Sequence, residues 1–295
     1  MDQREKSGAA LVALSAFGFG LMPIFAKICY GAGASTYTLL FLRFLAAAIF
    51  MMAMMRVRKL PRLSKKERWT YFFLGAIGDS AQAFCYFMAL QYASAGAVSL
   101  LLYTYPAMVM VGSAFIYKEK ITGDKVLSLV LATAGAFIIM GGNLDGEPVG
   151  LLLALLSALV YTTYIFYSAK FLRPGVGAQS SAYMMVGNAV TYGIISLFVG
   201  FDPPRTPPGL IALVLITLLS TIVAFWAYME GLGRLGPTKT SLVSLLEPLL
   251  TVLFSVIILG EALTKDILIG GCLVMASLFI TVRTSHKKAR INLEE

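Results

Sequence analysis

A glutamate and a proline interrupt one of the most apolar segments of the chain. Glu247 stands directly before Pro248 in SLLEPLLTV, residues 244–252. Asp79 lies in the middle of another apolar segment, residues 68–91. Moving a carboxylate out of water is costly, so an acidic residue in such surroundings commonly faces a functional site or a cation.

Two kinds of chemistry are open to Glu247. Its carboxylate could bind the ammonium group of a substrate, or it could carry a proton, since burial favours the neutral form of a carboxyl group. An ion pair with Arg43, another charged residue inside an apolar segment, is the structural alternative. Tyrosine rings nearby would add apolar and cation–π contacts to a bound amine.

Polar and aromatic residues recur on the apolar segments at spacings that place them on one face of a helix. Several such faces, in a chain with little other polar surface, predict a central water-filled cavity. Packing between helices is the plainer interpretation of the serines and threonines. The predicted substrate-binding residues are Glu247, Asp79, Gln82, Tyr86, Tyr103, Tyr105, Tyr161, Tyr164, Asn188 and Ser244.

Most catalytic chemistries lack their residues. His286 is the single histidine, and the cysteines at 29, 85 and 272 lie far apart in apolar segments. Neither a histidine-based catalytic group, nor a zinc site, nor a disulfide framework is expected from this pattern. We therefore expect no metal, no cofactor and no enzymatic activity.

The composition indicates where the embedded polar residues must lie. Of 295 residues, 58% are hydrophobic and 13% are charged, about half the charged fraction of a soluble domain. A segment of about 20 apolar residues can cross a bilayer. The sequence predicts an all-α integral membrane protein with ten transmembrane helices at 9–29, 35–56, 68–91, 96–117, 122–142, 148–169, 179–200, 208–232, 237–259 and 264–282.

Basic residues predict the orientation of these spans. If the N-terminus is cytoplasmic, 20 of the 24 lysines and arginines lie in inside segments, and two, Arg205 and Lys265, lie in outside loops. Lysine and arginine are in excess in cytoplasmic loops, so both termini are predicted to be cytoplasmic. The net charge of +9 then reflects topology, and no nucleic-acid partner is expected.

The chain contains an internal repeat. SLLLYTYPAMVMVGSAFIYKEKITGD and SLVSLLEPLLTVLFSVIILGEALTKD match at a constant offset of 142 residues, which pairs Pro106 with Pro248 and Glu119 with Glu261. One offset sustained along the chain indicates a duplication. Each repeat holds five spans, an odd number, so the second crosses the membrane inverted, as in many secondary transporters. The predicted repeats are residues 1–142 and 148–290.

Residues that recur in both repeats are predicted to have structural roles, and a residue present in one repeat alone is predicted to be specialised. Pro106 and Pro248 each remove a backbone donor and are predicted to be paired hinges, with a static kink as the alternative. The glutamates at 119 and 261 are predicted to build the hairpins that follow these spans. Glu247 pairs with Tyr105 at the same offset, so its carboxylate belongs to one repeat alone.

Three motifs resemble those of a known family. LRFLAAA at 42–48, the P…E.IT ending of the fourth span and the LLEPLL…LGEALT ending of the ninth are similar to EamA-type members of the drug/metabolite transporter superfamily. The resemblance covers essentially the whole chain. It implies export of small metabolites, often amino acids, across a cytoplasmic membrane through a cavity between the two halves.

We therefore expect a multi-pass transporter of the cytoplasmic membrane that works by alternating access. Its expected partners are the lipid bilayer and a small amine-bearing or zwitterionic solute, with proton coupling as an open question; the sequence indicates no oligomeric state. The alternative within transport is an exchanger of organic anions such as sugar phosphates or nucleotide sugars. A channel and a membrane enzyme are remoter alternatives.

Overall fold

The computed structural model describes residues 3–116, 123–141, 147–171, 176–235, 243–244 and 246–294, and in these ranges it contains helices and no strand. The helices are α1 (Gln3–Gly31), α2 (Thr36–Val57), α3 (Lys65–Phe73), η1 (Leu74–Asp79), α4 (Ser80–Tyr92), α5 (Ala95–Leu102), α6 (Tyr105–Ile116), α7 (Gly123–Gly141), α8 (Pro148–Phe171), α9 (Gly177–Val199), α10 (Pro207–Thr217), η2 (Leu218–Val223), α11 (Ala224–Leu235), α13 (Leu246–Leu259) and α14 (Lys265–Glu294).

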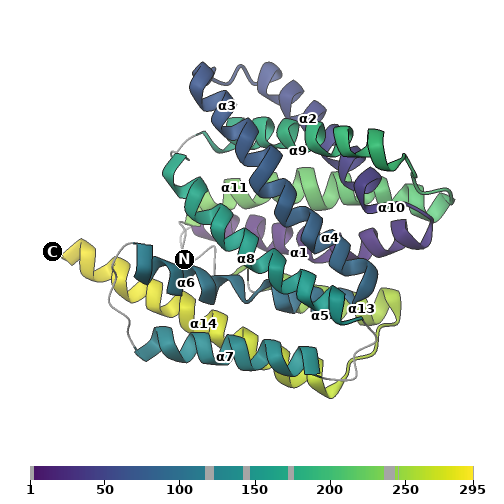
Figure 1. Cartoon of the computed structure of the whole chain (residues 1–295). Helices are drawn as coiled ribbons and strands as arrows, with labels where there is room; N and C mark the ends of the chain where they lie inside the picture. The colour runs from purple at the N-terminus through teal and green to yellow at the C-terminus, as the bar shows by residue number, and fades with distance from the viewer. Residues whose placement is uncertain are drawn as a thin grey trace.

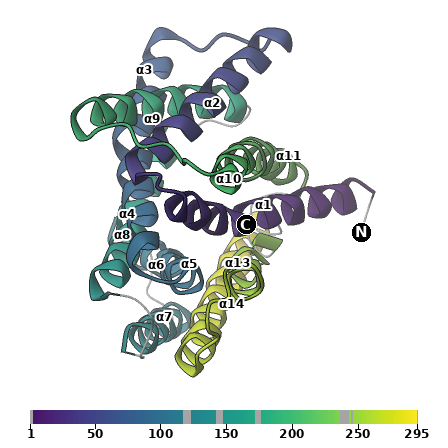
Figure 2. The same ribbon diagram turned by 90° about the vertical axis from the view of Figure 1, so that its right-hand side faces the viewer.

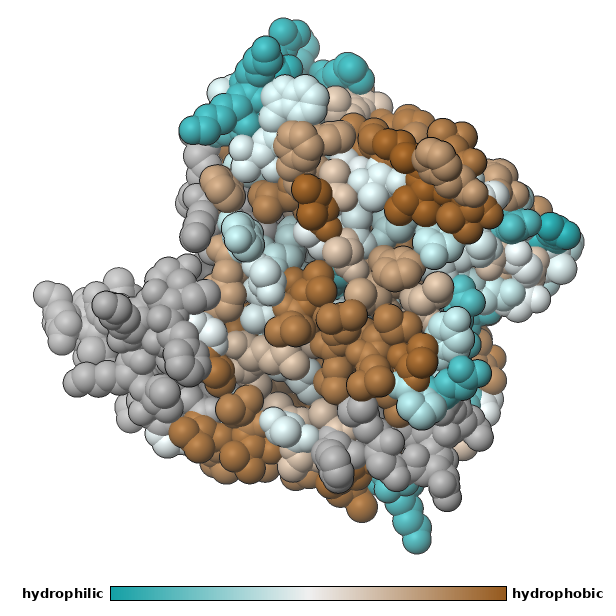
Figure 3. Space-filling model, in the orientation of Figure 1, coloured by the Kyte–Doolittle hydropathy of each residue, from teal (hydrophilic) through white to brown (hydrophobic). Residues whose placement is uncertain are grey.

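The helices have the length and the surface of membrane spans. Within the described ranges, six are long and apolar enough to cross a bilayer, and three shorter apolar helices accompany them. Large hydrophobic side chains point outward, with Leu197 83% and Phe198 85% exposed. Figure 3 shows broad hydrophobic areas over the sides of the helices on one face, with the most hydrophilic residues near its edges. Such a surface suits lipid rather than water.

Serine and threonine set the starts of several helices. The side chains of Ser35, Ser94 and Thr206 each accept a hydrogen bond from a backbone N–H in the first turn of α2, α5 and α10, respectively. Ser64 and Glu67 form a reciprocal capping box at the start of α3. These side chains satisfy backbone donors that have no partner within the helix.

Helices from the two halves of the sequence pack against each other. The second predicted span packs on the seventh (α2 on α9), and the fifth on the tenth (α7 on α14). The first packs on the eighth (α1 on α11), and the third on the sixth (α4 on α8). In both views α7 and α14 lie at one end of the molecule and α2, α3 and α9 at the other (Figures 1 and 2).

A π-helix interrupts the third predicted span, and another interrupts the eighth. Each is six residues long: Leu74–Asp79 (η1) and Leu218–Val223 (η2). The sequence predicted uninterrupted α-helices here. The wider turn leaves carbonyls for other donors: Thr191 of α9 donates to the Ala76 carbonyl at 2.8 Å, and Thr221 donates to the Ile216 carbonyl at 2.9 Å. Single π-helical turns occur frequently at functional sites.

The fourth predicted span is two helices rather than one. Helix α5 ends at Leu102 and α6 begins at Tyr105, while the Thr104 hydroxyl donates to the Leu101 carbonyl at 2.8 Å across the break. Pro106 lies in the first turn of α6 and Pro248 in the first turn of α13. Proline is suited to a first turn, whose N–H groups have no partner within the helix. The expected single helix at 96–117 is therefore corrected to a pair.

Two glycines allow η1 and α9 to touch backbone to backbone. A Cβ atom on Gly75 would lie 2.1 Å from the Met184 carbonyl oxygen, and one on Gly187 would lie 2.2 Å from the Phe72 carbonyl oxygen. Both obstacles are backbone atoms, which cannot rotate away as a side chain can. This contact fixes the depth and direction of Asp79, the last residue of η1.

We predict that Gly75→Ala destabilises the protein by about 1–3 kcal/mol, because the added methyl group forces η1 and α9 apart. Thermal unfolding of the detergent-purified protein measures the loss. Gly31→Ala is the matched control, since no atom lies within 4 Å of a Cβ built there. Equal unfolding temperatures for the two variants would contradict the prediction.

Candidate functional site

Asp79 and Asn188 meet between η1 and α9. The Asn188 Nδ2 atom donates to Asp79 Oδ2 at 2.6 Å, and the Ser80 hydroxyl donates to Asn188 Oδ1 at 2.7 Å. Asn188 is fully buried. Two of the predicted site residues are thus brought into direct contact, and one amide orients the carboxylate.

Gln82 and Ser157 tie α4 to α8. Gln82 Nε2 donates to the Ser157 hydroxyl at 3.1 Å. The Ser157 hydroxyl in turn donates to the backbone carbonyl oxygen of Gln82 at 3.3 Å. Gln82 was predicted to bind substrate. In the structure its side chain also bridges two helices, as polar groups between membrane helices commonly do, and its role in binding stays a prediction.

Tyrosines surround Glu247, which lies in the first turn of α13. Tyr103, at the end of α5, is in side-chain hydrogen-bonding contact with the carboxyl group. Tyr86, Tyr105 and Tyr228 also interact with it electrostatically. No ion pair to Glu247 occurs among the residues that the structure describes. Its neighbours therefore offer π faces and phenol groups rather than a positive charge.

Tyr228 was absent from the predicted site. The internal repeat carried the signal that could have found it, because Tyr228 lies 142 residues after Tyr86. Both tyrosines interact electrostatically with Glu247. The offset thus brings two equivalent residues, one from α4 and one from α11, to the same carboxyl group.

A row of aromatic rings joins Glu247 to Asp79. The ring centroids of Tyr103 and Tyr105 are 6.0 Å apart, and the edge-to-face pair of Tyr105 and Tyr161 is separated by 4.7 Å. Tyr161 stacks on Tyr164 at 6.0 Å and interacts electrostatically with Asp79. The four predicted tyrosines of this row thus form one continuous group between the two carboxylates.

Arg43 lies with Asp79 rather than with Glu247. Its guanidinium sits 4.7 Å from the ring centroid of Phe44 and 4.9 Å from that of Phe87, and the residue is 8% exposed. Its electrostatic partners are Asp79, Tyr192, Tyr30 and Tyr86. The structure does not bring Arg43 and Glu247 together as the predicted ion pair; over the described part of the chain neither residue has an ion-pair partner.

Glu261, which corresponds to Glu119 of the first repeat, makes structural contacts. Glu261 accepts hydrogen bonds from the backbone N–H groups of Ala95 at 2.9 Å and Gly96 at 3.4 Å, and it pairs with Lys27 at 3.1 Å. A carboxylate is favourable at the N-terminus of a helix, here that of α5. Glu119 lies outside the described residues.

Ser244 is the last of the predicted binding residues. Ser244 lies in the short described stretch 243–244 ahead of α13 and is half-buried.

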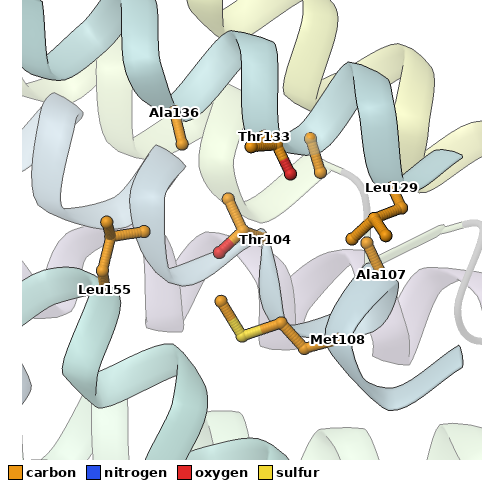
Figure 4. Close-up of a pocket in the computed structure, with 8 residues that line it drawn as sticks. Thr104, Ala107, Met108, Leu129, Thr133, Ala136 and Leu155 are labelled. Atoms are coloured by element: carbon orange, nitrogen blue, oxygen red, sulfur yellow. The ribbon is translucent and has the colours of Figure 1, made fainter. Parts of the chain in front are cut away.

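An apolar cavity of about 230 Å³ lies behind the break between α5 and α6. Figure 4 shows Thr104 from this break together with side chains of α6, α7 and α8 that point into the space. Its lining contains no charged residue and none of the predicted binding residues. The lining residues are Thr104, Ala107, Met108, Leu129, Ala132, Thr133, Ala136 and Leu155.

Metal chemistry has no support in the described ranges, where no group of three or more His, Cys, Asp or Glu side chains could hold an ion.

The repeats seen in the sequence coincide with two matches to one family. The model of the EamA-like transporter family matches residues 6–141 and again residues 148–283. The chain belongs to this family. It is a multi-pass protein of the cell membrane and a transporter, and its chemistry is translocation rather than catalysis.

Similar proteins share this assignment without a stated substrate. An uncharacterized transporter of Haemophilus influenzae is 25% identical over 86% of this chain and 85% of its own length. The uncharacterized inner membrane transporter YhbE of Escherichia coli is 27% identical over 86% of this chain and 82% of its own. A crystal structure with 18% identity superposes with a TM-score of 0.68, covering 96% of this chain and 98% of that one. The last comparison shows the same fold.

We predict that Asn188→Ala lowers stability by about 1.5–3 kcal/mol, because it removes the donor to a buried carboxylate. The measurement is again thermal unfolding in detergent. Adding Asp79→Asn to Asn188→Ala should recover part of the loss, since a neutral amide is less costly to leave unpaired than a carboxylate. Strict additivity of the two single changes would show that Asn188 does not support Asp79.

Proposed function

We propose that the protein is a secondary transporter that exports small amine-bearing or zwitterionic metabolites, of which amino acids are the simplest, by alternating access. Glu247 binds the ammonium group of the substrate, and the surrounding tyrosines contact its apolar part. Proton coupling, the second task predicted for Glu247, would use the same carboxyl group at another stage of the cycle.

One observation carries this proposal: Glu247 lies among tyrosines and has no cationic partner in the described structure. A buried carboxylate without a cation is costly, whereas tyrosine faces and a carboxylate together attract an organic cation. A substrate ammonium would supply the missing charge. The row from Tyr105 to Tyr164 would then line the route between Glu247 and Asp79.

The proposal includes ten spans in two inverted repeats with cytoplasmic termini. Its support is the pair of family matches and the cross-packing of corresponding helices. Both chain ends also lie on the same side of the molecule in Figure 1. The broken fourth span, the two π-helices and the prolines at 106 and 248 give each repeat weakened helices, which are suitable hinges for rocking.

The organic-anion alternative receives less support. Sugar phosphates and nucleotide sugars call for several cations, because each phosphate is best held by multiple charged donors. Of the two embedded cations, Lys27 is engaged by Glu261 at 3.1 Å. Arg43 is then the one cation left at depth in the described helices, and it lies near Asp79.

We predict that Glu247→Gln lowers counterflow of amino acids and amines in proteoliposomes at least about tenfold, as expected when a charge-assisted contact is lost. The change is nearly isosteric, so the protein should still purify as a folded monodisperse sample. Glu147→Gln, at an exposed residue, is the matched control and should transport normally.

The outcome separates the two tasks of the carboxyl group. If counterflow persists while accumulation driven by a proton gradient disappears, Glu247 carries the proton. Unchanged counterflow and unchanged accumulation would remove both tasks from this residue.

We predict that a membrane-impermeant thiol reagent labels Arg205→Cys but not Lys66→Cys in intact cells, in a Cys272→Ser background. Both positions are exposed, Arg205 between α9 and α10 and Lys66 in the first turn of α3, and the proposed orientation places them on opposite sides of the membrane. After the membrane is permeabilised, both should react. Labelling of Lys66→Cys in intact cells would indicate the opposite orientation in the membrane.

A further inference from the structure

Arg43 has unmet hydrogen-bonding capacity deep in the protein. Its Nε and Nη1 atoms are buried and have no hydrogen-bond partner in the described structure. The guanidinium carries donors in a planar fork and remains charged in proteins. A buried N–H donor without an acceptor costs folding free energy, whereas an apolar group of the same shape at that place does not.

The electrostatic partners of Arg43 form hydrogen bonds with other groups. The Tyr30 hydroxyl donates to the Phe87 carbonyl at 2.9 Å, and the Tyr192 hydroxyl donates to the Ser80 carbonyl. Asp79 Oδ2 is held by Asn188 at 2.6 Å, and Asp79 forms no ion pair with Arg43. Asp79 thus balances the charge of Arg43 without satisfying its N–H groups.

Aromatic rings hold the guanidinium in place. Phe44 and Phe87 both lie within 5 Å of its central carbon, at 4.7 and 4.9 Å. Phe44 stacks in turn on Tyr192, with 5.9 Å between centroids and 9° between planes. A guanidinium fixed between rings loses little freedom when it binds a planar, two-oxygen partner.

Tyr86 links this group to the Glu247 site. It interacts electrostatically with both Arg43 and Glu247. Tyr86 thus lies within the electrostatic influence of one positive and one negative group, and neither has an ion-pair partner in the part of the chain that the structure describes.

We propose that Arg43 is the carboxylate-recognition residue of the transport site, so that the substrate is a zwitterion with its carboxylate at Arg43 and its ammonium group at Glu247. This inference rests on the proposed function. A carboxylate fits better than a phosphate, because Arg43 is a single cation whose charge Asp79 already offsets in part. Since Arg43 is 8% exposed, the carboxylate reaches it in a conformation in which the helices around α2 have moved apart, as alternating access requires.

The test compares amino acids with the amines formed from them by loss of the carboxylate. Three pairs serve as probes: phenylalanine with phenethylamine, leucine with isopentylamine, and lysine with cadaverine. Binding to the purified full-length protein is measured by ligand-induced thermal stabilisation and by isothermal titration. For at least one pair, the wild-type protein should bind the amino acid about 10- to 100-fold more tightly than the amine, the discrimination expected when a site built for a polar group is offered a ligand without it.

Arg43→Gln should abolish this preference by weakening the amino acid while leaving the amine unchanged. Arg43→Lys, which keeps the charge but not the planar fork, should restore part of it. Arg205→Gln removes an exposed arginine that pairs with Asp202 and should leave the preference intact. Unfolding temperatures without ligand show that each variant is folded before its ligand binding is compared.

The outcomes separate this inference from the function on which it rests. Arg43 is not the carboxylate site if the wild type binds amines without preferring amino acids and Glu247→Gln no longer binds those amines. The same conclusion follows if folded Arg43→Gln keeps the preference for amino acids. If the wild type binds neither member of any pair, the proposed function and this inference both fail. An equal loss of both ligands in Arg43→Gln and Arg43→Lys would assign Arg43 to the structure of the site rather than to recognition.

Discussion

Hydrocarbon offers no hydrogen bonds, and that constraint explains most of the polar contacts in this structure. A polar group inside a membrane helix must find its partner within the protein. Asn188 does so for Asp79, Ser157 for Gln82, and the start of α5 for Glu261. Against this background Glu247 and Arg43 stand out, because in the described structure Glu247 forms no ion pair and the Nε and Nη1 atoms of Arg43 have no hydrogen-bond partner. Such exceptions are costly for the fold, so they are the natural places to look for a ligand.

The embedded charges of the two repeats differ, whereas the structural features are shared. At the offset of 142 residues Arg43 corresponds to Met185, Asp79 to Thr221 and Glu247 to Tyr105. None of the three embedded charges has a charged counterpart. The π-helices, in contrast, occur at nearly equivalent positions in both halves. A symmetric frame thus supplies the helix breaks and the cross-packing, whereas each of these charges occurs in only one copy, Arg43 and Asp79 in the first and Glu247 in the second.

The sequence predicted the broad fold well, because composition and a constant offset leave few alternatives for a chain of this kind. It also predicted that Asp79, Asn188 and the tyrosines at 103, 105, 161 and 164 belong to one region, and the structure brings these six together; their role in binding stays a prediction. It could not predict the π-helix at residues 74–79, since periodicity assumes 3.6 residues per turn throughout. Asp79 contacts α9 while Gln82, three residues further on, contacts α8, so the polar face predicted for this span meets two different helices. The sequence also could not predict which residues surround Arg43, because this depends on how α2, α4 and α9 pack together.

The cross-packing of the halves has a consequence for how the protein is made. Helix α1 packs on α11 and α13, and α4 packs on α8. Synthesis proceeds from the N-terminus, so the first helices are threaded into the bilayer long before their partners leave the ribosome. Until then their polar faces, including those of Asp79 and Gln82, meet lipid or water instead of Asn188 and Ser157. The first five helices are thus a repeat in evolution but not a unit of assembly.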